Sequence, residues 1–199
     1  MGSRRLGVKR LNALALQGQG VTSALQPGVS GSIGHRKIMK SGNEIVTEIY
    51  VDLGSSKGPL YQPGNAGEII AHSASTDSGA TMTAGNGNLT QVTLKENGIV
   101  TLVEMTCVET PTGGDVDIDL VHAAALQKFS GSTSLTTLIN AGDAVIGAEN
   151  AAALDDNSLQ DQYLYLATGD GAAYTADAAE YTDGKFLIRL YGHTAPDDV

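Results

Sequence analysis

The chain has 199 residues, of which 12 are lysine or arginine and 22 are aspartate or glutamate, so its formal net charge is -10. A chain of this length forms one domain, or one domain with an extension, and buries a sizeable core. With 25 glycines and 5% aromatic residues, the composition argues against a long-helix bundle and favours short elements joined by tight turns.

The charge is unevenly distributed along the chain. Residues 1–43 contain seven cations and no acid, and the first acid is Glu44, so residues 44–199 carry five cations against 22 acids. This asymmetry predicts a basic arm, residues 1–43, attached to an acidic body, residues 44–199. We expect the arm to be mostly extended and to be ordered by a partner.

Strands are the elements that the body sequence predicts first. Residues 44–53 follow a two-residue period, and residues 68–73 form a weaker short strand. One face of the first strand carries Ile45, Thr47, Ile49, Val51 and Leu53. Residues 89–96 and 99–109 flank Asn97-Gly98, a pair that favours the type I′ turn of a β-hairpin.

Further strands are expected toward the C-terminus. Residues 115–121 alternate acidic and aliphatic side chains, which predicts that the acids face water, and residues 135–146 form another strand. Residues 151–162 hold the one plausible helical turn of the body. Residues 162–167 and 184–192 are also predicted strands; Tyr163 and Tyr165 share a face of the former, and Phe186, Ile188 and Leu190 share a face of the latter.

This succession of about seven to nine strands, without regular strand–helix alternation, predicts an all-β fold. We expect an antiparallel β-sandwich or jelly-roll-like body with an extended basic N-terminal arm. No stretch of about 20 mostly apolar residues is present, so no membrane-spanning helix is predicted. The N-terminus lacks the apolar core of a secretory signal, which indicates folding in a cytoplasm.

Two acidic clusters are the first candidates for chemistry. Asp115, Asp117 and Asp119 repeat about 7 Å apart along one strand, which suggests either a Ca²⁺ site or the solvated face of an edge strand. We favour the solvated face, because carboxylates along an extended strand do not converge. The second cluster lacks the spacing of an EF-hand loop and predicts a capped loop or short helix; it contains Asp155, Asp156, Asn157 and Asp161.

Histidine and cysteine positions do not indicate a catalytic site. Cys107, the single cysteine, excludes an internal disulfide and lies in an alternating run, so it is predicted to be a small buried side chain. The four histidines lie far apart without metal-ligand spacing; they are His35, His72, His122 and His193. We therefore predict a protein that is not an enzyme and has no metal or cofactor. The enzymatic alternative is a hydrolase that uses scattered histidines and aspartates.

The arm interleaves cations with apolar side chains, which favours docking to an acidic protein surface. It contains no aromatic residue for base stacking, so a nucleic-acid partner is disfavoured. The predicted contact residues are Arg4, Arg5, Leu6, Lys9, Arg10, Leu11, Leu14, Arg36, Lys37 and Lys40.

Several strings together resemble short capsid-associated virion proteins of marine and cyanobacterial tailed phages. They lie at residues 1–6, 51–54, 109–114, 117–121, 163–167, 184–188 and 196–198. None is a catalytic motif. The resemblance implies a head decoration, or cement, role: an all-β body bound outside the shell of the major capsid protein, commonly as a symmetric oligomer.

From the arm and this resemblance we expect a structural protein that decorates and stabilises a tailed-phage capsid. It would be made in the host cytoplasm, reside on the capsid surface of the virion, and form a trimer or dimer. The alternative is a tail, neck or receptor-binding component in which loops at residues 75–88 and 169–183 face a host glycan.

Overall fold

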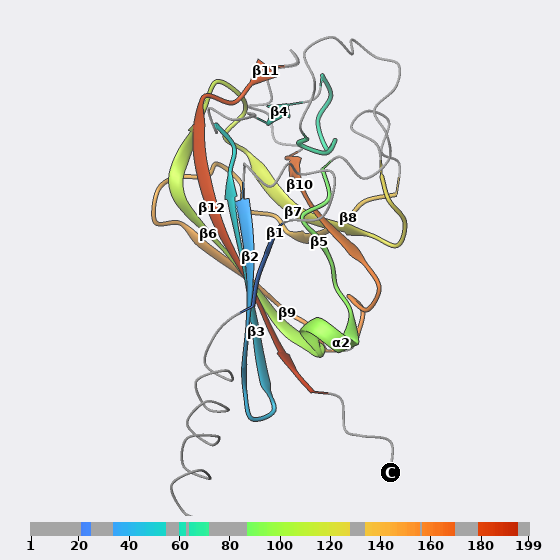
Figure 1. Ribbon diagram of the computed structural model, residues 1–199. Coiled ribbons are helices and arrows are strands. Elements are labelled where there is room, and N and C mark those ends of the chain that lie inside the picture. The colour runs from blue at the N-terminus through green and yellow to red at the C-terminus, as the bar shows by residue number, and fades with distance from the viewer. Residues whose placement is uncertain are drawn as a thin grey trace, which may run out of the picture.

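The protein is an all-β antiparallel sandwich in the computed structural model (Figure 1), confirming the predicted fold class. The structure describes residues 21–24, 34–54, 60–62, 64–71, 87–127, 134–155, 157–169 and 179–194. The larger sheet has the order β1 (Val21–Ala24), β2 (Gly34–Ser41), β3 (Glu44–Asp52), β12 (Asp183–His193), β6 (Ile99–Thr112) and β9 (Glu149–Ala153). The smaller has the order β5 (Thr90–Gln91), β10 (Tyr163–Thr168), β7 (Ile118–Ala123) and β8 (Thr136–Ile139).

Two further elements complete the described fold. A two-stranded sheet pairs β11 (Ala179–Glu180) with β4 (Tyr61–Gln62). A single helical turn, α2 (Leu94–Asn97), lies between β5 and β6 and carries the chain from the small sheet to the large one.

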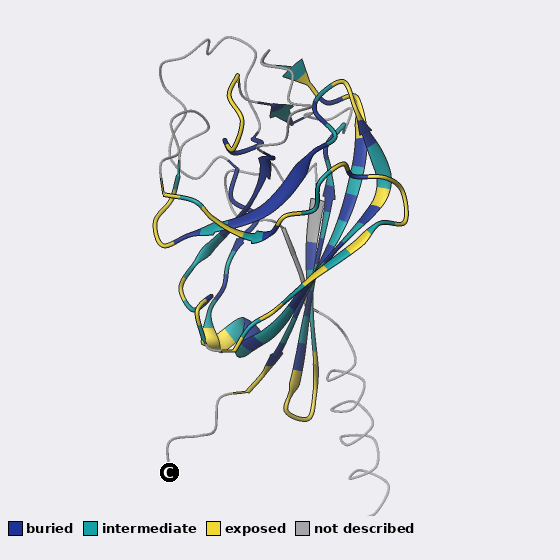
Figure 2. Cartoon of the chain, turned by 180° about the vertical axis from the view of Figure 1, so that it is seen from behind, coloured by how far each residue is buried: buried dark blue, intermediate teal, exposed yellow. Residues whose placement is uncertain are grey.

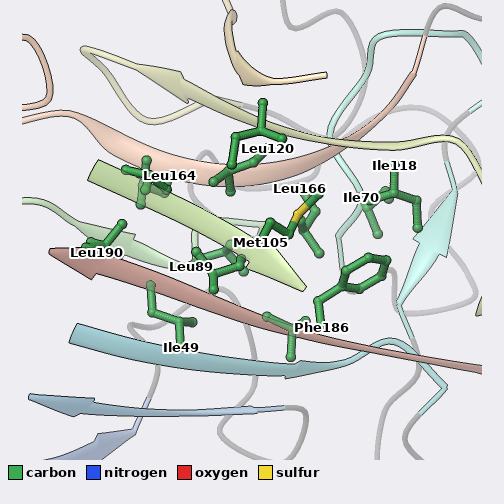
Figure 3. Close-up of a cluster of buried hydrophobic side chains, with 14 of the residues drawn as sticks. Ile49, Ile70, Leu89, Met105, Ile118, Leu120, Leu164, Leu166, Phe186 and Leu190 are labelled. Atoms are coloured by element: carbon green, nitrogen blue, oxygen red, sulfur yellow. The ribbon is translucent and has the colours of Figure 1, made fainter. Parts of the chain in front are cut away.

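The core lies between the six-stranded and the four-stranded sheet (Figure 3). Ile49, Met105 and Phe186 come from the six-stranded sheet, and Leu120 and Leu164 come from the four-stranded sheet. The period-two predictions for residues 44–53 and 184–192 are confirmed, because β3 and β12 alternate strictly between buried and half-buried positions. Burial of these inward faces is the main favourable term for folding.

The predicted hairpin at Asn97-Gly98 is wrong. Asn97 ends α2, Gly98 caps it with a φ of 66°, and the two flanking strands belong to different sheets. The Asn97 side chain is buried, accepts a hydrogen bond from the Thr93 amide (2.9 Å) and donates one to Thr47 Oγ1 (2.9 Å). A positive φ was predicted for both residues of the pair, but only Gly98 has one, and it serves a helix C-terminus rather than a hairpin turn.

The predicted helical turn within residues 151–162 is also misplaced. Residues 149–153 form strand β9 at one edge of the six-stranded sheet, and hydrogen-bonded turns follow at residues 158–161. The predicted strand at 135–146 is shorter than expected, because β8 covers only Thr136–Ile139.

The boundary of the predicted arm also changes. β2 lies inside the six-stranded sheet, where it pairs with β3 from Gly34↔Val51 to Ser41↔Glu44. β1 pairs in turn with β2 and forms the opposite edge from β9. Residues 34–43 are therefore part of the sandwich rather than of a separate arm.

Candidate functional site

The sequence-predicted contact residues fall into two groups. The first seven, which are Arg4, Arg5, Leu6, Lys9, Arg10, Leu11 and Leu14, lie outside the described residues. The other three, Arg36, Lys37 and Lys40, lie on β2. The structure therefore shows the base of the basic segment and how it joins the body.

Arg36 has an internal role, which corrects its prediction as a capsid contact. The residue is 6% exposed, and its Nη1 donates to Thr90 Oγ1 (2.6 Å) and pairs with Glu96 Oε2 (2.9 Å). Because Arg36 is on the six-stranded sheet and Thr90 on the four-stranded sheet, the guanidinium bridges the two sheets. A buried cation needs such partners to offset its desolvation.

The two lysines of β2 are placed differently. Lys40 is exposed, and its Nζ donates to the Lys95 carbonyl (3.1 Å) of α2. Lys37 is half-buried and stands opposite Glu48 in the β2–β3 register. Opposite charges at directly paired positions stabilise a sheet modestly, by roughly 0.2–1 kcal/mol.

A row of alternating charges crosses the outer face of the six-stranded sheet. Lys37 is opposite Glu48, Glu48 is opposite Arg189, and Arg189 is opposite Glu104. Arg189 Nε donates to Glu48 Oε1 (3.2 Å), and this hydrogen bond raises the pKa of Arg189. The charges on this row compensate one another within the body.

An apolar row runs beside the charged one. Met39, Val46, Tyr191 and Leu102 are register neighbours across four strands, and all are half-buried. The Tyr191 hydroxyl donates to Glu104 Oε2 (2.7 Å), and burial together with this bond raises the pKa of the tyrosine. Such a mixed face suits protein contact through shape and apolar area more than through net charge.

The predicted exposure of Asp115, Asp117 and Asp119 is wrong. They are 5%, 7% and 6% exposed. Asp119 lies on β7, which pairs with both β10 and β8 and is buried along nearly its whole length (Figure 2), and Asp115 and Asp117 lie just before that strand. Asp115 Oδ1 accepts from the Asp117 amide (3.0 Å), and Asp119 Oδ1 accepts from the Ala141 amide (3.1 Å). The Asp115 and Asp119 carboxylates therefore satisfy backbone donors within the protein.

The described residues of the second acidic cluster do not form a candidate metal site. Asp155 and Asp161 are exposed, and Asp156 lies outside the described residues. In the part of the chain that the structure describes, no group of three or more His, Cys, Asp or Glu is placed to hold a metal ion.

The histidines and Cys107 occupy structural positions where they are described. His122 Nδ1 lies 3.2 Å from Gln162 Oε1, and His193 is exposed at the end of β12. His72 and the side chain of His35 lie outside the described part. Cys107 is 3% exposed, as predicted, and burial raises the pKa of its thiol, which keeps it a weak nucleophile at neutral pH.

Comparison of the chain with family models, curated proteins and solved structures finds no match. No helix among the described residues is long and apolar enough to cross a membrane.

Sequence reasoning did not single out Thr90 or Glu96, the partners of Arg36, because neither residue carries a signal of such pairing in the sequence.

Proposed function

We propose that the protein is a structural virion protein that decorates a tailed-phage capsid, with residues 1–20 as the segment that binds the major capsid protein lattice. One observation carries this proposal. β1 is the edge strand of the six-stranded sheet, and it is preceded by a segment with four cations, no acid and interleaved leucines.

The charge pattern of the body supports this choice of segment. Arg36, Lys185 and Arg189 form ion pairs with Glu96, Glu109 and Glu48. By contrast, residues 1–20 carry four cations and no acid; the cations are Arg4, Arg5, Lys9 and Arg10. An acidic capsid surface would attract this segment, while the acidic body would point its own charge toward solvent.

The strand that follows this segment is anchored in the larger sheet. β1 and β2 pair in register over four residues, and β2 pairs over eight with β3. The bridge from Arg36 to Thr90 joins this end of the large sheet to the small sheet. A lattice contact made through residues 1–20 is therefore attached to the whole sandwich, and repetition over many copies multiplies weak contacts into firm binding.

Truncation tests the attachment role directly. Deletion of residues 2–20 should abolish co-sedimentation with capsids assembled from the major capsid protein, while the thermal unfolding midpoint of the body changes little. The variant with Arg4, Arg5, Lys9 and Arg10 each replaced by Glu should bind as poorly as the truncated protein. Lys95→Glu, at an exposed cation of the body, is the matched control and should bind normally.

Salt dependence and copy number sharpen the test. Binding should weaken as ionic strength rises, because the Debye length falls from about 10 Å at 0.1 M to about 3 Å at 1 M. Undiminished binding by the truncated protein would contradict the proposal. Copies numbering in the hundreds per virion fit decoration, whereas a few to a few dozen would favour the tail, neck or receptor-binding alternative. Light scattering on the purified protein tests the trimer or dimer that we propose for the decorating unit.

A further inference from the structure

A cavity of about 220 Å³ opens on the outer face of the four-stranded sheet, away from the sandwich core. Its walls come from three of the strands and their ends. Among the residues that line it are Asp119, Val121, Thr137, Asn140, Ala167 and Thr168. Polar and apolar side chains therefore meet here on one face.

A β-bulge between β7 and β8 creates this arrangement. Leu120 is opposite Ile139, whereas the next residue of β7, Val121, is opposite Thr137, so β8 contains one extra residue at this point. In a regular strand, Thr137 and Asn140 would lie on opposite faces, but here both line the cavity. Bulges that redirect side chains are frequent next to binding sites.

The polar groups of the cavity are of three kinds. Asp119 is 6% exposed, and the Ala141 amide fixes its Oδ1 at 3.1 Å, which orients the carboxylate. Thr168 is buried, and its hydroxyl lies within hydrogen-bond distance of the Asn65 (3.3 Å) and Glu68 (3.4 Å) carbonyls, so its proton is used within the protein and its oxygen remains an acceptor. Thr137 and Asn140 are exposed at the mouth, where they offer a hydroxyl and a carboxamide.

We propose that this cavity binds one neutral monosaccharide unit of a glycan. The Asn140 carboxamide presents two adjacent polar atoms, which match the paired hydroxyls of a sugar ring, and the Asp119 carboxylate supplies a charged acceptor in the same cavity. Val121 and Ala167 supply apolar surface for the C–H side of the ring. The volume lies below the roughly 300–1,000 Å³ of drug-sized sites, so a single ring is the unit that fits.

The chemistry of the lining disfavours other ligand classes. Among the described residues that line the cavity there is no cation, and the Asp119 carboxylate repels anions, which disfavours phosphates and acidic sugars. Asp119 is the one carboxylate among these described residues, whereas divalent cations are held by several charged oxygen ligands. The site does not depend on residues 1–20, so it stands independently of the proposed capsid attachment.

Saturation-transfer NMR on the purified full-length protein tests this site. The probes are glucose, galactose, mannose and N-acetylglucosamine at millimolar concentration, with N-acetylneuraminic acid as the anionic probe. We expect transfer to at least one neutral sugar and none to the anionic one. Asn140→Ala and Thr137→Ala should each weaken binding about two- to tenfold, the effect of one lost hydrogen bond.

Asn43→Ala is the matched control, because Asn43 is an exposed asparagine in the β2–β3 turn. It should bind the sugar as the unchanged protein does. Absence of transfer to every neutral sugar, or equal affinity in Asn140→Ala, overturns the proposal. A change in the Asn140 side-chain amide resonance with calcium chloride but with no sugar would identify a cation site and overturns it as well. Each measurement uses the protein without capsids, so its result is separate from that of the binding assay above.

Discussion

The six-stranded and four-stranded sheets share one core but differ in what lies on their outer faces. β3 and β12 alternate between buried and half-buried residues along their length. β10 and β7 are buried at nearly every position, including those that point away from the sandwich core. Figure 2 shows this difference, with alternating shades along the long strands and almost continuous dark blue along β7 and β10.

The outer face of the four-stranded sheet carries a second apolar cluster. Ile69, Val121, Tyr165 and Ala167 are at most 3% exposed and pack together there. A largely buried polar side chain on this face, such as Asp119, needs protein donors such as the Ala141 amide. The same residue type thus has different energetics on the two sheets, and the following substitutions test that difference.

Tyr165→Ala should have the largest effect, a loss of about 3–5 kcal/mol in the free energy of unfolding. Tyr165 is fully buried on the outer face, and its hydroxyl accepts a hydrogen bond from the Gln127 amide (3.0 Å). Leu164→Ala, on the opposite face of the same strand, should cost about 2–5 kcal/mol. Urea unfolding measures both, and a loss below about 1 kcal/mol at Tyr165 would show that the outer face is not a true core.

Gly98→Ala should cost about 2–5 kcal/mol at the crossover between the two sheets. Gly98 has a φ of 66°, and a Cβ there would overlap the His193 carbonyl oxygen. Gly42 has a similar φ of 59° but open space around it, so Gly42→Ala should cost only about 1 kcal/mol. Equal losses in denaturant unfolding would mean that backbone conformation alone decides both sites.

Asp119→Ala should cost about 1–3 kcal/mol, because it leaves the Ala141 amide without its acceptor. Glu149→Ala, at an exposed position of β9, should change stability by no more than about 0.5 kcal/mol. Thermal unfolding of the two variants compares a buried with an exposed carboxylate. A neutral Asp119→Ala would restore the solvated-strand interpretation of this residue.

Leu187→Ala should have the smallest effect, about 1 kcal/mol or less, since Leu187 is half-buried on the outer face of the six-stranded sheet. Its neighbour Ile188 is fully buried on the inner face, and Ile188→Ala should cost about 2–5 kcal/mol. Urea unfolding of these two variants measures the difference in stability loss between the two faces of β12, a difference that β10 is expected to lack. Similar losses in the free energy of unfolding at both positions would indicate that the outer face of β12 is covered by other parts of the protein.

Sequence patterns predicted well those strands that have one buried face and one partly exposed face. Along β3 and β12, buried residues such as Ile45, Ile49 and Phe186 alternate with half-buried ones. This two-residue period is visible without any tertiary information. Cys107 was likewise assigned correctly, because it lies within such a strand. The all-β class follows from these strands together.

The errors fall where long-range contacts override local signals. Asn97-Gly98 has the composition of a hairpin turn, yet Thr47, about 50 residues earlier in the chain, provides the partner that holds Asn97 at the end of a helical turn. The bulge at Leu120 and Val121, which assembles the cavity, depends on the pairing of β7 with β8 and has no signature in either strand.

Sequence alone therefore determined the β class, the central strands β3, β12 and β6 of the larger sheet, and the unequal distribution of charge between the N-terminus and the rest of the chain. Only the tertiary structure decided that Arg36 and Asp119 are internal, because burial depends on which strands pack above and below a residue. Local periodicity reports the environment of one face, whereas the second face of a strand is covered by segments distant in the chain.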